Sequence, residues 1–388
     1  MTTPASPDGG NDAAAVDPGG RDTADHGGAT GAEVEPETGA AGGGPNGGAA
    51  GTGRAAATGG VAPTGGAAGT SSAAGTSGVA GTDEAGTAGS SGSAGAPAPI
   101  TKFVGNITFR EQVDAEGLTF SDHWDQITPE NAGTWGAVQS QANAGFNWSA
   151  LDAIYDYTED SGIAFKQHSF VWGSQQPRGE ISPADVQNWM ESFCKRYPHT
   201  RVIDVVNEPP PHTNPAYADA IGGGTDSSWQ WIANAFIWAR AACPDAVLLL
   251  NDYNIIENDD ENARVIDIVR SIQDAGAPID AVGAEGCDAA KLPIATVKAY
   301  MDEINTQTGL PLYITEYLVT SADDDEQLRI YQEQFPVFFD TQYVHGITIW
   351  GWIYNPVWSV DVDSYLVRNG APRPAMTWLM QRLERPVP

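Results

Sequence analysis

The most informative stretch of the chain is Val202-Ile203-Asp204-Val205-Val206-Asn207-Glu208, and its design recurs in Leu310-Pro311-Leu312-Tyr313-Ile314-Thr315-Glu316. Each stretch is a short apolar run that closes on a glutamate. Parallel strands buried on both faces have this continuous apolar character, so both stretches are predicted to be buried strands. A carboxylate at the C-terminal end of such a strand lies on the face where barrel enzymes hold their active sites.

Strand patterns of the same kind recur along the chain and alternate with helical patterns. The other expected strands are Phe103–Thr108, His123–Thr128, Ile163–Trp172, Ala246–Tyr253, Ala281–Cys287 and Gly346–Trp352. The expected helices are Ser149–Asp160, Pro183–Tyr197, Ser228–Ala242, Asp260–Ala275 and Asp324–Phe339. Eight strands alternating with helices predict an α/β fold, a (β/α)₈ TIM barrel. The competing fold is a doubly wound open sheet, but its usual glycine-rich turn does not follow the first strand.

The composition of the chain changes near residue 100. No Phe, Tyr or Trp precedes Phe103, and residues 1–99 consist largely of Gly, Ala, Thr, Ser and Pro with scattered acids. Such a segment cannot bury enough apolar area to offset its chain entropy, so we predict a disordered tether over residues 1–99. Residues 100–388 are then one barrel domain, close to the ~250 residues typical of the fold.

The net charge of −31 limits the partners of the chain. Nucleic acid and anionic membranes are not expected partners, and the acidic surface fits a soluble secreted protein or one adapted to salt. No apolar stretch is long enough to span a bilayer, so no membrane insertion is expected. No signal peptide follows Met1, yet the tether is typical of an exported protein. We therefore expect a secreted or surface-tethered monomer whose N-terminus is trimmed or misassigned.

The cysteines and histidines do not indicate a metal site. Cys194, Cys243 and Cys287 lack metal-type spacing. Cys194 and Cys243 each lie near the end of an expected helix, so they form either one disulfide or two buried free thiols. No second histidine stands at a ligand spacing from His168, and we predict neither a metal nor a cofactor.

The two strand-end glutamates predict hydrolysis of a glycosidic bond. A single glutamate in this position is often a structural, salt-bridged acid, but a pair supplies the two carboxyl groups that the reaction needs. One stays protonated and gives its proton to the leaving oxygen, while the other is ionised and attacks the anomeric carbon. Burial and mutual repulsion separate their pKa values. Asn207, beside Glu208, is placed to bond a sugar 2-hydroxyl.

Several further side chains have both a structural and a sugar-binding interpretation. Glu130 and Asn131 follow Pro129, where they form either a simple turn or a polar clamp for hydroxyl groups. His168 is either a core histidine or part of a sugar grip with Trp172 and Gln175. The tryptophans Trp350, Trp352 and Trp358 either fill the core or form stacking walls, and the first two are expected to share one strand face.

With these residues, the chain resembles the retaining endo-β-1,4-xylanases of glycoside hydrolase family 10 over residues 102–384. The motifs that carry the resemblance are Gln126-Ile127-Thr128-Pro129-Glu130-Asn131, His168 with Val171-Trp172, Asp204-Val205-Val206-Asn207-Glu208, Ile314-Thr315-Glu316 and Trp350-Gly351. The resemblance implies that residues 100–388 are a catalytic domain acting on xylan or a related plant cell-wall polysaccharide.

The resemblance also implies a role for each matching residue. Glu208 corresponds to the general acid/base and Glu316 to the nucleophile. The family positions that hold the glycone sugars fall on Glu130, Asn131, His168 and Asn207, its aromatic walls on Trp350 and Trp358, and its leaving-group side on Asn251 and Tyr253. Trp172, Gln175 and Glu285 complete the expected substrate-binding set.

The chain departs from the family pattern on both sides of the expected site. Thr134 stands where the family usually has a lysine, and Gly173 where it often has a histidine. Glu285 and Cys287 replace the Gln and His that usually follow the sixth strand, and that His contacts the nucleophile. Three activities therefore remain open: xylan hydrolysis, hydrolysis of another or a substituted β-glycan, and carbohydrate binding with little turnover.

Overall fold

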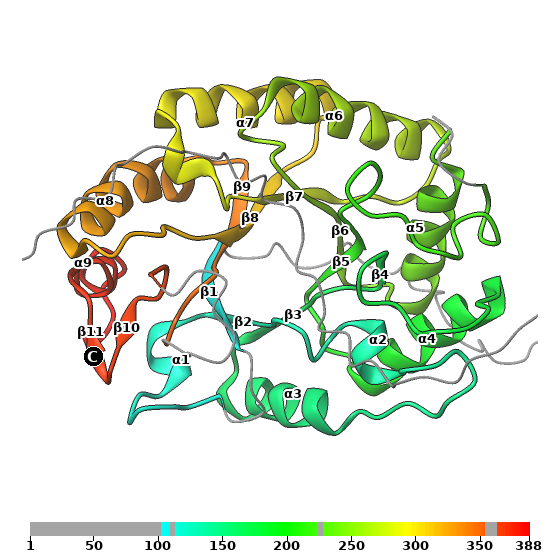
Figure 1. The fold of residues 1–388 in the computed structure, drawn as a ribbon, viewed down its shortest axis with the longest axis horizontal. Helices are drawn as coiled ribbons and strands as arrows, with labels where there is room; N and C mark the ends of the chain where they lie inside the picture. Colours follow the sequence, from blue (N-terminus) through cyan, green and yellow to red (C-terminus); the bar gives the residue numbers. More distant parts are fainter. Residues whose placement is uncertain (1–101, 109–112, 224–227, 354–362) are drawn as a thin grey trace, which may run out of the picture. The chain divides into compact units, whose positions relative to one another are not determined.

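The computed structural model describes residues 102–108, 113–223, 228–353 and 363–388. These residues form a parallel sheet closed into a barrel, with helices arranged around the strands (Figure 1). The strand order is β3-β2-β1-β9-β8-β7-β6-β5-β4, and pairing of β3 with β5 closes the ring. Because β3 and β4 are two pieces that both pair with β5, the nine segments occupy eight positions. The predicted (β/α)₈ barrel is confirmed.

The barrel strands are β1 Phe103–Thr108, β2 Gln126–Pro129, β3 Ala164–Gln167, β4 Val171–Trp172, β5 Val202–Asn207, β6 Val247–Tyr253, β7 Ala281–Glu285, β8 Leu312–Tyr317 and β9 Val344–Ile349. The α-helices are α1 Phe120–His123, α2 Trp135–Val138, α3 Ser149–Ser161, α4 Pro183–Arg196, α5 Gln230–Ala242, α6 Asp259–Asp274, α7 Ile294–Thr308, α8 Asp324–Asp340 and α9 Pro374–Arg382. A 3₁₀ turn, η1 Ala289–Lys291, precedes α7, and a small hairpin joins β10 Val367–Arg368 to β11 Ala371–Pro372.

The expected elements differ from the observed ones mainly at their ends. The segment expected as one strand over Ile163–Trp172 is interrupted after Gln167, and the segment begun at His123 starts its strand only at Gln126. Helices α1, α2, α7 and α9 were absent from the expected helices. The predicted boundary between residues 99 and 100 stays a prediction, since residues 1–101 lie outside the described part of the chain.

Buried apolar side chains fill the space between the strands and the helices. Helix α4 illustrates the local rules: Ser182 accepts from the backbone of Asp185, whose carboxylate accepts from Ser182 in return. This capping box and Pro183 fix where the helix begins. Its apolar face, which includes Trp189 and Phe193, is fully buried against the sheet. Among the described residues, no helix is long and apolar enough to cross a membrane.

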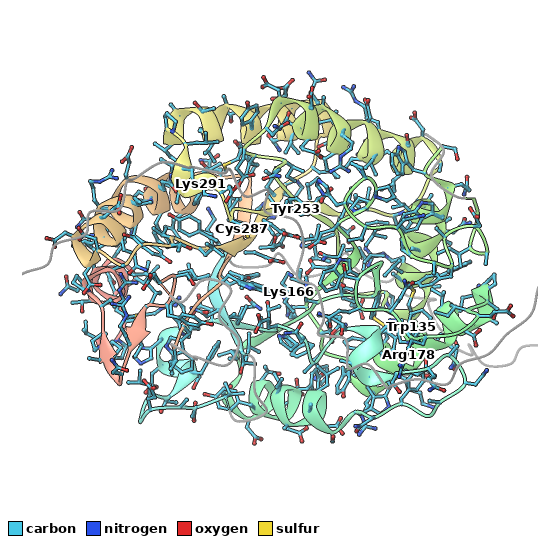
Figure 2. All side chains as sticks on the ribbon, in the orientation of Figure 1. Trp135, Lys166, Arg178, Tyr253, Cys287 and Lys291 are labelled. Atoms are coloured by element: carbon cyan, nitrogen blue, oxygen red, sulfur yellow. A yellow bond between two sulfur atoms is a disulfide. The ribbon has the colours of Figure 1, made fainter. Side chains whose placement is uncertain are left out.

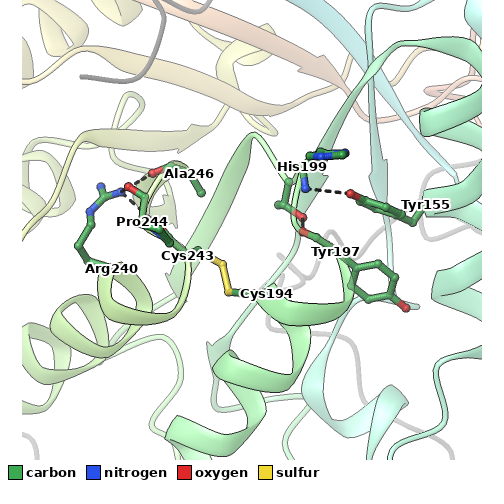
Figure 3. The surroundings of a disulfide bond; sticks show 9 residues. Tyr155, Cys194, Tyr197, His199, Arg240, Cys243, Pro244 and Ala246 are labelled. Carbon is green, nitrogen blue, oxygen red and sulfur yellow. Dashed lines mark hydrogen bonds between the residues drawn. A yellow bond between two sulfur atoms is a disulfide. The ribbon is translucent and has the colours of Figure 1, made fainter. Parts of the chain in front are cut away.

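A disulfide links the ends of two neighbouring helices. Cys194 lies in the last turn of α4, and Cys243 follows α5 directly, with 5.5 Å between their Cα atoms (Figure 3). The bond closes a loop across 49 residues of sequence that contains the whole of β5. The alternative of two buried free thiols is therefore wrong. Cys287 is the free cysteine.

Candidate active site

Glu208 lies immediately after β5 in a left-handed backbone conformation, with φ of 45°. This conformation is uncommon for a residue with a side chain, and such residues cluster at functional sites. The backbone N–H of Glu208 donates to the carbonyl of Asn251 at 2.9 Å. The indole N–H of Trp172 donates to Glu208 Oε2, also at 2.9 Å. Two neighbouring strands therefore fix the direction of the carboxyl group.

The environment of Glu208 favours its protonated form. Burial raises the pKa of Glu208 to about 7, the negative charge of Asp252 adds to the rise, and the bond from Trp172 opposes it. A carboxyl group with a pKa near 7 holds its proton in weakly acidic solution and can release it to a leaving group. This is the environment required of a general acid.

Glu316 lies within β8, across the barrel mouth, and its residue surface is 8% exposed. The amide of Asn251 donates to Glu316 Oε1 at 3.4 Å, and His168 Nδ1 lies 3.9 Å from the same oxygen. Burial, with the carboxylates of Glu208 and Asp204, holds the pKa of Glu316 well above its ordinary value, and the buried ammonium of Lys166 and the Asn251 bond oppose this rise. Glu316 is thus the carboxyl group with a cation and a donor nearby.

Lys166 lies near the centre of the barrel (Figure 2), and its buried ammonium forms an ion pair with the buried carboxylate of Asp204. His168 Nδ1 lies 2.9 Å from Asp204 Oδ2. Burial lowers the pKa of His168, and the imidazole is therefore neutral and donates its Nδ1–H to Asp204. Burial opposes ionisation of Asp204, but Lys166 and His168 hold its pKa below the ordinary value.

Asn251 connects the two candidate catalytic glutamates. Its Nδ2 donates to Asn207 Oδ1 at 2.8 Å and to Glu285 Oε1 at 2.9 Å, and its Oδ1 accepts from the hydroxyl of Thr315 at 2.6 Å. Gly283 makes room for this amide, because a Cβ at that position would lie 2.3 Å from Asn251 Oδ1. The amide is therefore held in one orientation, with its nitrogen toward the carboxyl groups.

The candidate glycone side contains a chain of neutral hydrogen bonds. Gln175 Nε2 donates to Asn131 Oδ1 at 2.7 Å, and the Thr134 hydroxyl donates to Gln175 Oε1 at 2.9 Å. Glu130 stands beside them, and burial raises its pKa to about 7. A Cβ on Gly173 would lie 2.8 Å from the backbone nitrogen of Asn214, so the loop after Glu208 fills the space of the expected histidine.

The candidate leaving-group side is built on β6 and on the loop after β5. Tyr253 stacks on His212 with ring centroids 3.7 Å apart and an angle of 12° between the planes. His212 Nδ1 lies 2.7 Å from Asp252 Oδ1, and Arg264 bonds the other oxygen of that carboxylate at 2.5 Å. The stack presents a flat surface next to Glu208, whose charge contributes to the raised pKa of Tyr253.

The tryptophans at the end of β9 differ from the expectation. The indole of Trp350 lies 5.7 Å from the His168 ring, inside the candidate site. The prediction that Trp352 shares this face is wrong: it is 4% exposed and packs edge-on against Phe120 of α1 in the core. The strand ends at Ile349, and Gly351 has φ of 150°, so alternation along a strand no longer applies. Trp358 lies outside the described residues.

One atom each of Glu285, Cys287 and Glu316 lies within 4.8 Å of the others. The Cys287 thiol donates to the carbonyl of Glu316 at 3.5 Å, and burial together with the adjacent carboxylates raises its pKa. That the chain uses no metal remains a prediction.

Sequence reasoning missed four residues of the site: Lys166, Asp204, His212 and Thr315. Asp204 and Thr315 stood inside the quoted strand motifs, where a polar side chain in an apolar run is a usable signal. Lys166 is two residues from His168 in the expected strand Ile163–Trp172, which was a weaker signal of the same kind. His212 lies in a proline-rich loop, and nothing in the sequence indicates its stacking on Tyr253.

A closed (β/α)₈ barrel with two carboxyl groups at the C-terminal ends of its strands defines a class that includes many glycoside hydrolases. The profile of one family, "Glycosyl hydrolase family 10", matches residues 98–382. The chain belongs to glycosyl hydrolase family 10.

Relatives and solved structures agree with this assignment. The chain is 40% identical over 286 residues to endo-1,4-beta-xylanase B of Cellvibrio japonicus, covering 72% of this chain and 45% of that protein. It is 26% identical over 261 residues to endo-1,4-beta-xylanase B of Thermotoga neapolitana, covering 60% and 71%. The structure of xylanase 10B from Thermotoga maritima shares the fold, with TM-score 0.60, 21% identity, and coverage of 73% and 95%. The chain thus spans less than half of the Cellvibrio protein.

Proposed function

We propose that this chain hydrolyses internal β-1,4-xylosidic bonds of xylan with net retention at the anomeric carbon. Glu316 attacks the anomeric carbon, and Glu208 gives its proton to the leaving sugar oxygen. Glu208 then removes a proton from water, which attacks the same carbon and releases Glu316. Asn207 and Asn251 bind polar groups of the substrate on either side of the glycosidic bond that is cut.

The observation that carries the proposal is the unequal treatment of the two glutamates. Burial raises the pKa of Glu208 to about 7 and that of Glu316 well above its ordinary value, but only Glu316 has the Lys166 ammonium and the Asn251 amide nearby to favour its ionised form. Two carboxyl groups in different environments can hold one proton between them and act as acid and base. The named xylanases among its relatives support xylan as the substrate.

The test combines product analysis with two isosteric variants. Wild type on beechwood-type xylan should release a ladder of oligosaccharides whose new ends first appear, by NMR, in the β configuration. Glu316→Gln should lower turnover at least about 1,000-fold, because the covalent intermediate can no longer form. Glu208→Ala should keep much of its first-step rate on an aryl xyloside with an acidic leaving group, which needs no protonation. Products of inverted configuration would reject the mechanism.

A second substrate is favoured by Thr134 and Gly173. The family's usual lysine is replaced by Thr134, whose hydroxyl bonds Gln175. Its usual histidine is replaced by Gly173, which packs closely against Asn214. The glycone side therefore offers fewer cationic contacts, which suits another β-glycan or a substituted xylan. Reducing-sugar assays over a panel of polysaccharides separate these substrates. Binding of xylan without turnover would instead indicate a carbohydrate-binding protein.

We also keep three expectations about the cellular setting as proposals. The chain acts as a monomer, it is secreted or attached to the cell surface, and residues 1–99 serve as its tether. Sedimentation of the full chain and assays of culture fractions test the first two. Deletion of residues 1–99 should leave the melting temperature unchanged if the domain boundary is correct.

A further inference from the structure

The Asn251 amide has fewer hydrogens than the acceptors around it. Its two N–H hydrogens face Asn207 Oδ1 at 2.8 Å, Glu285 Oε1 at 2.9 Å and Glu316 Oε1 at 3.4 Å. The amide cannot turn over to relieve this, because its oxygen accepts from Thr315 at 2.6 Å. Two hydrogens satisfy the two nearer acceptors, and Glu316 receives the weakest contact. The carboxyl pair Glu285/Glu316 therefore lacks one donor.

The charges around Glu285 would also oppose its ionisation. Glu285 is 4% exposed, and burial is the main reason that its pKa lies well above the ordinary value. The charges that act on it most strongly are all negative, namely Glu316, Glu208, Asp252 and Asp204. Nearby Cys287 and Tyr253 are neutral acids, and Asp252 is further engaged by His212 and Arg264.

Glu316 differs from Glu285 in having a cation close by. Burial and the carboxylates of Glu208 and Asp204 hold the pKa of Glu316 above its ordinary value, and the ammonium of Lys166, which is paired with Asp204, opposes that rise. His168 Nδ1 also lies 3.9 Å from Glu316 Oε1. Where two buried carboxyl groups lie this close, one proton is enough to remove the repulsion between them. Glu285, the carboxyl group without a cation nearby, is the one that keeps the proton.

We infer that Glu285 is a positioning residue that remains a neutral carboxylic acid while Glu316 is ionised, supplying the donor that the Asn251 amide cannot. The inference rests on the proposed role of Glu316 as nucleophile. During attack the Glu316 carboxylate forms its bond to the anomeric carbon, and the proton of the leaving oxygen comes from Glu208. Glu285 keeps its own proton throughout, so that Glu316 is the sole ionised member of the pair.

Infrared spectroscopy of the full chain in D₂O near neutral pH tests the protonation state without requiring turnover. The spectrum of wild type minus Glu285→Gln should show the loss of one carboxylic-acid C=O band. The exposed Glu333→Gln variant, a matched control, should instead lose a carboxylate band. Loss of only a carboxylate band in Glu285→Gln would overturn the inference.

A reciprocal variant keeps the test decisive if Glu285→Gln does not fold. In Glu316→Gln the charge that acts most strongly on Glu285 is gone, so the carboxylic-acid band should disappear at a lower pH than in wild type. An unchanged titration would contradict the inference. Both spectra are interpretable even if the chain hydrolyses nothing, so failure of the proposed function is recognised separately.

The pH profile gives an independent measure when activity is present. If Glu285 is neutral while Glu316 titrates, Glu285→Gln should leave the acid limb of kcat/KM at the same pH, whatever the height of the plateau. If Glu285 is ionised there, removal of a charge within 4.8 Å should move that limb down. The move would be at least about one pH unit, and that result would reject the inference.

Discussion

The two walls of the candidate site depart from the family pattern in physically different ways. The glycone wall consists of Asn131, Thr134, Gly173 and Gln175, and the nucleophile wall of Asn251, Glu285, Cys287 and Glu316. On the glycone wall, a hydroxyl, an amide and backbone packing replace the expected cationic side chains. On the nucleophile wall, a carboxyl group and a thiol replace an amide and an imidazole.

The contrast shows that replacing a side chain by a neutral group and adding a charged group act over different distances. The gap at Gly173 is closed by residues in direct contact, so its effects stay local. The added carboxyl of Glu285 interacts with Glu316 of β8, Asp252 of β6, and Asp204 and Glu208 in or directly after β5. Charge acts over longer distances in a buried site than packing does. The nucleophile wall should therefore be the more sensitive to substitution.

The largest effect is expected from Lys166→Met, which removes the buried cation beneath the nucleophile wall. Asp204 would be left as an uncompensated buried charge, and Glu316 would lose its nearest cation. Breaking one side of a buried ion pair costs about 3–5 kcal/mol, so the free energy of unfolding should fall by that amount in urea titrations. The acid limb of the pH profile should also rise, because Lys166 lowers the pKa of Glu316.

Lys298→Met, at a half-exposed ion pair, is the matched control. Lys298 pairs with Asp302 one helical turn away, on the surface of α7. Surface pairs of this kind contribute less than about 0.5 kcal/mol. If the free energy of unfolding falls by a similar amount in both variants, the buried Lys166–Asp204 pair does not stabilise the nucleophile wall.

The fold was predictable because its signals are repeated. Eight buried runs such as Val202–Glu208 each carry the same apolar pattern, and an error at one end of a strand leaves the barrel intact. The break between β3 and β4 was missed, although the polar run Lys166-Gln167-His168-Ser169 stands inside the expected strand Ile163–Trp172. Strand ends depend on tertiary pairing more than on local preference.

Gly173→Ala tests the glycone wall at its tightest point. The added Cβ would meet Asn214 N at 2.8 Å and the Cβ of Thr213 at 2.9 Å, so the backbone has to move. Overpacking of this kind costs about 1–3 kcal/mol, measured as a lower urea midpoint. Turnover should fall too, because Thr213 bonds the carbonyl of Glu208. Gly145→Ala is the control, since a Cβ there meets nothing within 4 Å; equal losses would show that packing at Gly173 is loose.

The site was predictable only where single residues carry their own chemistry. Glu208, Glu316 and Asn251 stand at strand ends, and the structure brings them together as expected. The roles of Glu285 and Lys166 depend on which side chains of other strands they face across the barrel. The spacing of residues along the sequence does not show this. The direction of Trp352 was wrong for the related reason that the strand ended three residues earlier than assumed.

Trp172→Phe tests the hydrogen bond from the indole of Trp172, next to Gly173 of the glycone wall, to the carboxyl group of Glu208. Glu208 must carry its proton, so activity should fall as pH rises through its pKa of about 7. The indole N–H stabilises the ionised form, and its loss should raise that pKa and move the alkaline limb upward by about one pH unit. Trp350→Phe changes a ring that lies against His168 and should leave the limb in place. A downward move in Trp172→Phe would contradict the assignment of Glu208 as the acid.

The smallest effect is expected from Thr134→Val, an isosteric change on the glycone wall. The hydroxyl of Thr134 donates to Gln175 Oε1 at 2.9 Å, and Gln175 in turn donates to Asn131. Losing one neutral hydrogen bond costs about 1 kcal/mol, so KM for xylo-oligosaccharides should rise about fivefold with kcat nearly unchanged. Thr134→Ser keeps the hydroxyl and should retain the wild-type KM. If Thr134→Val instead lowers kcat at constant KM, the chain of amides reaches the reacting bond, and the separation between the two walls is not valid.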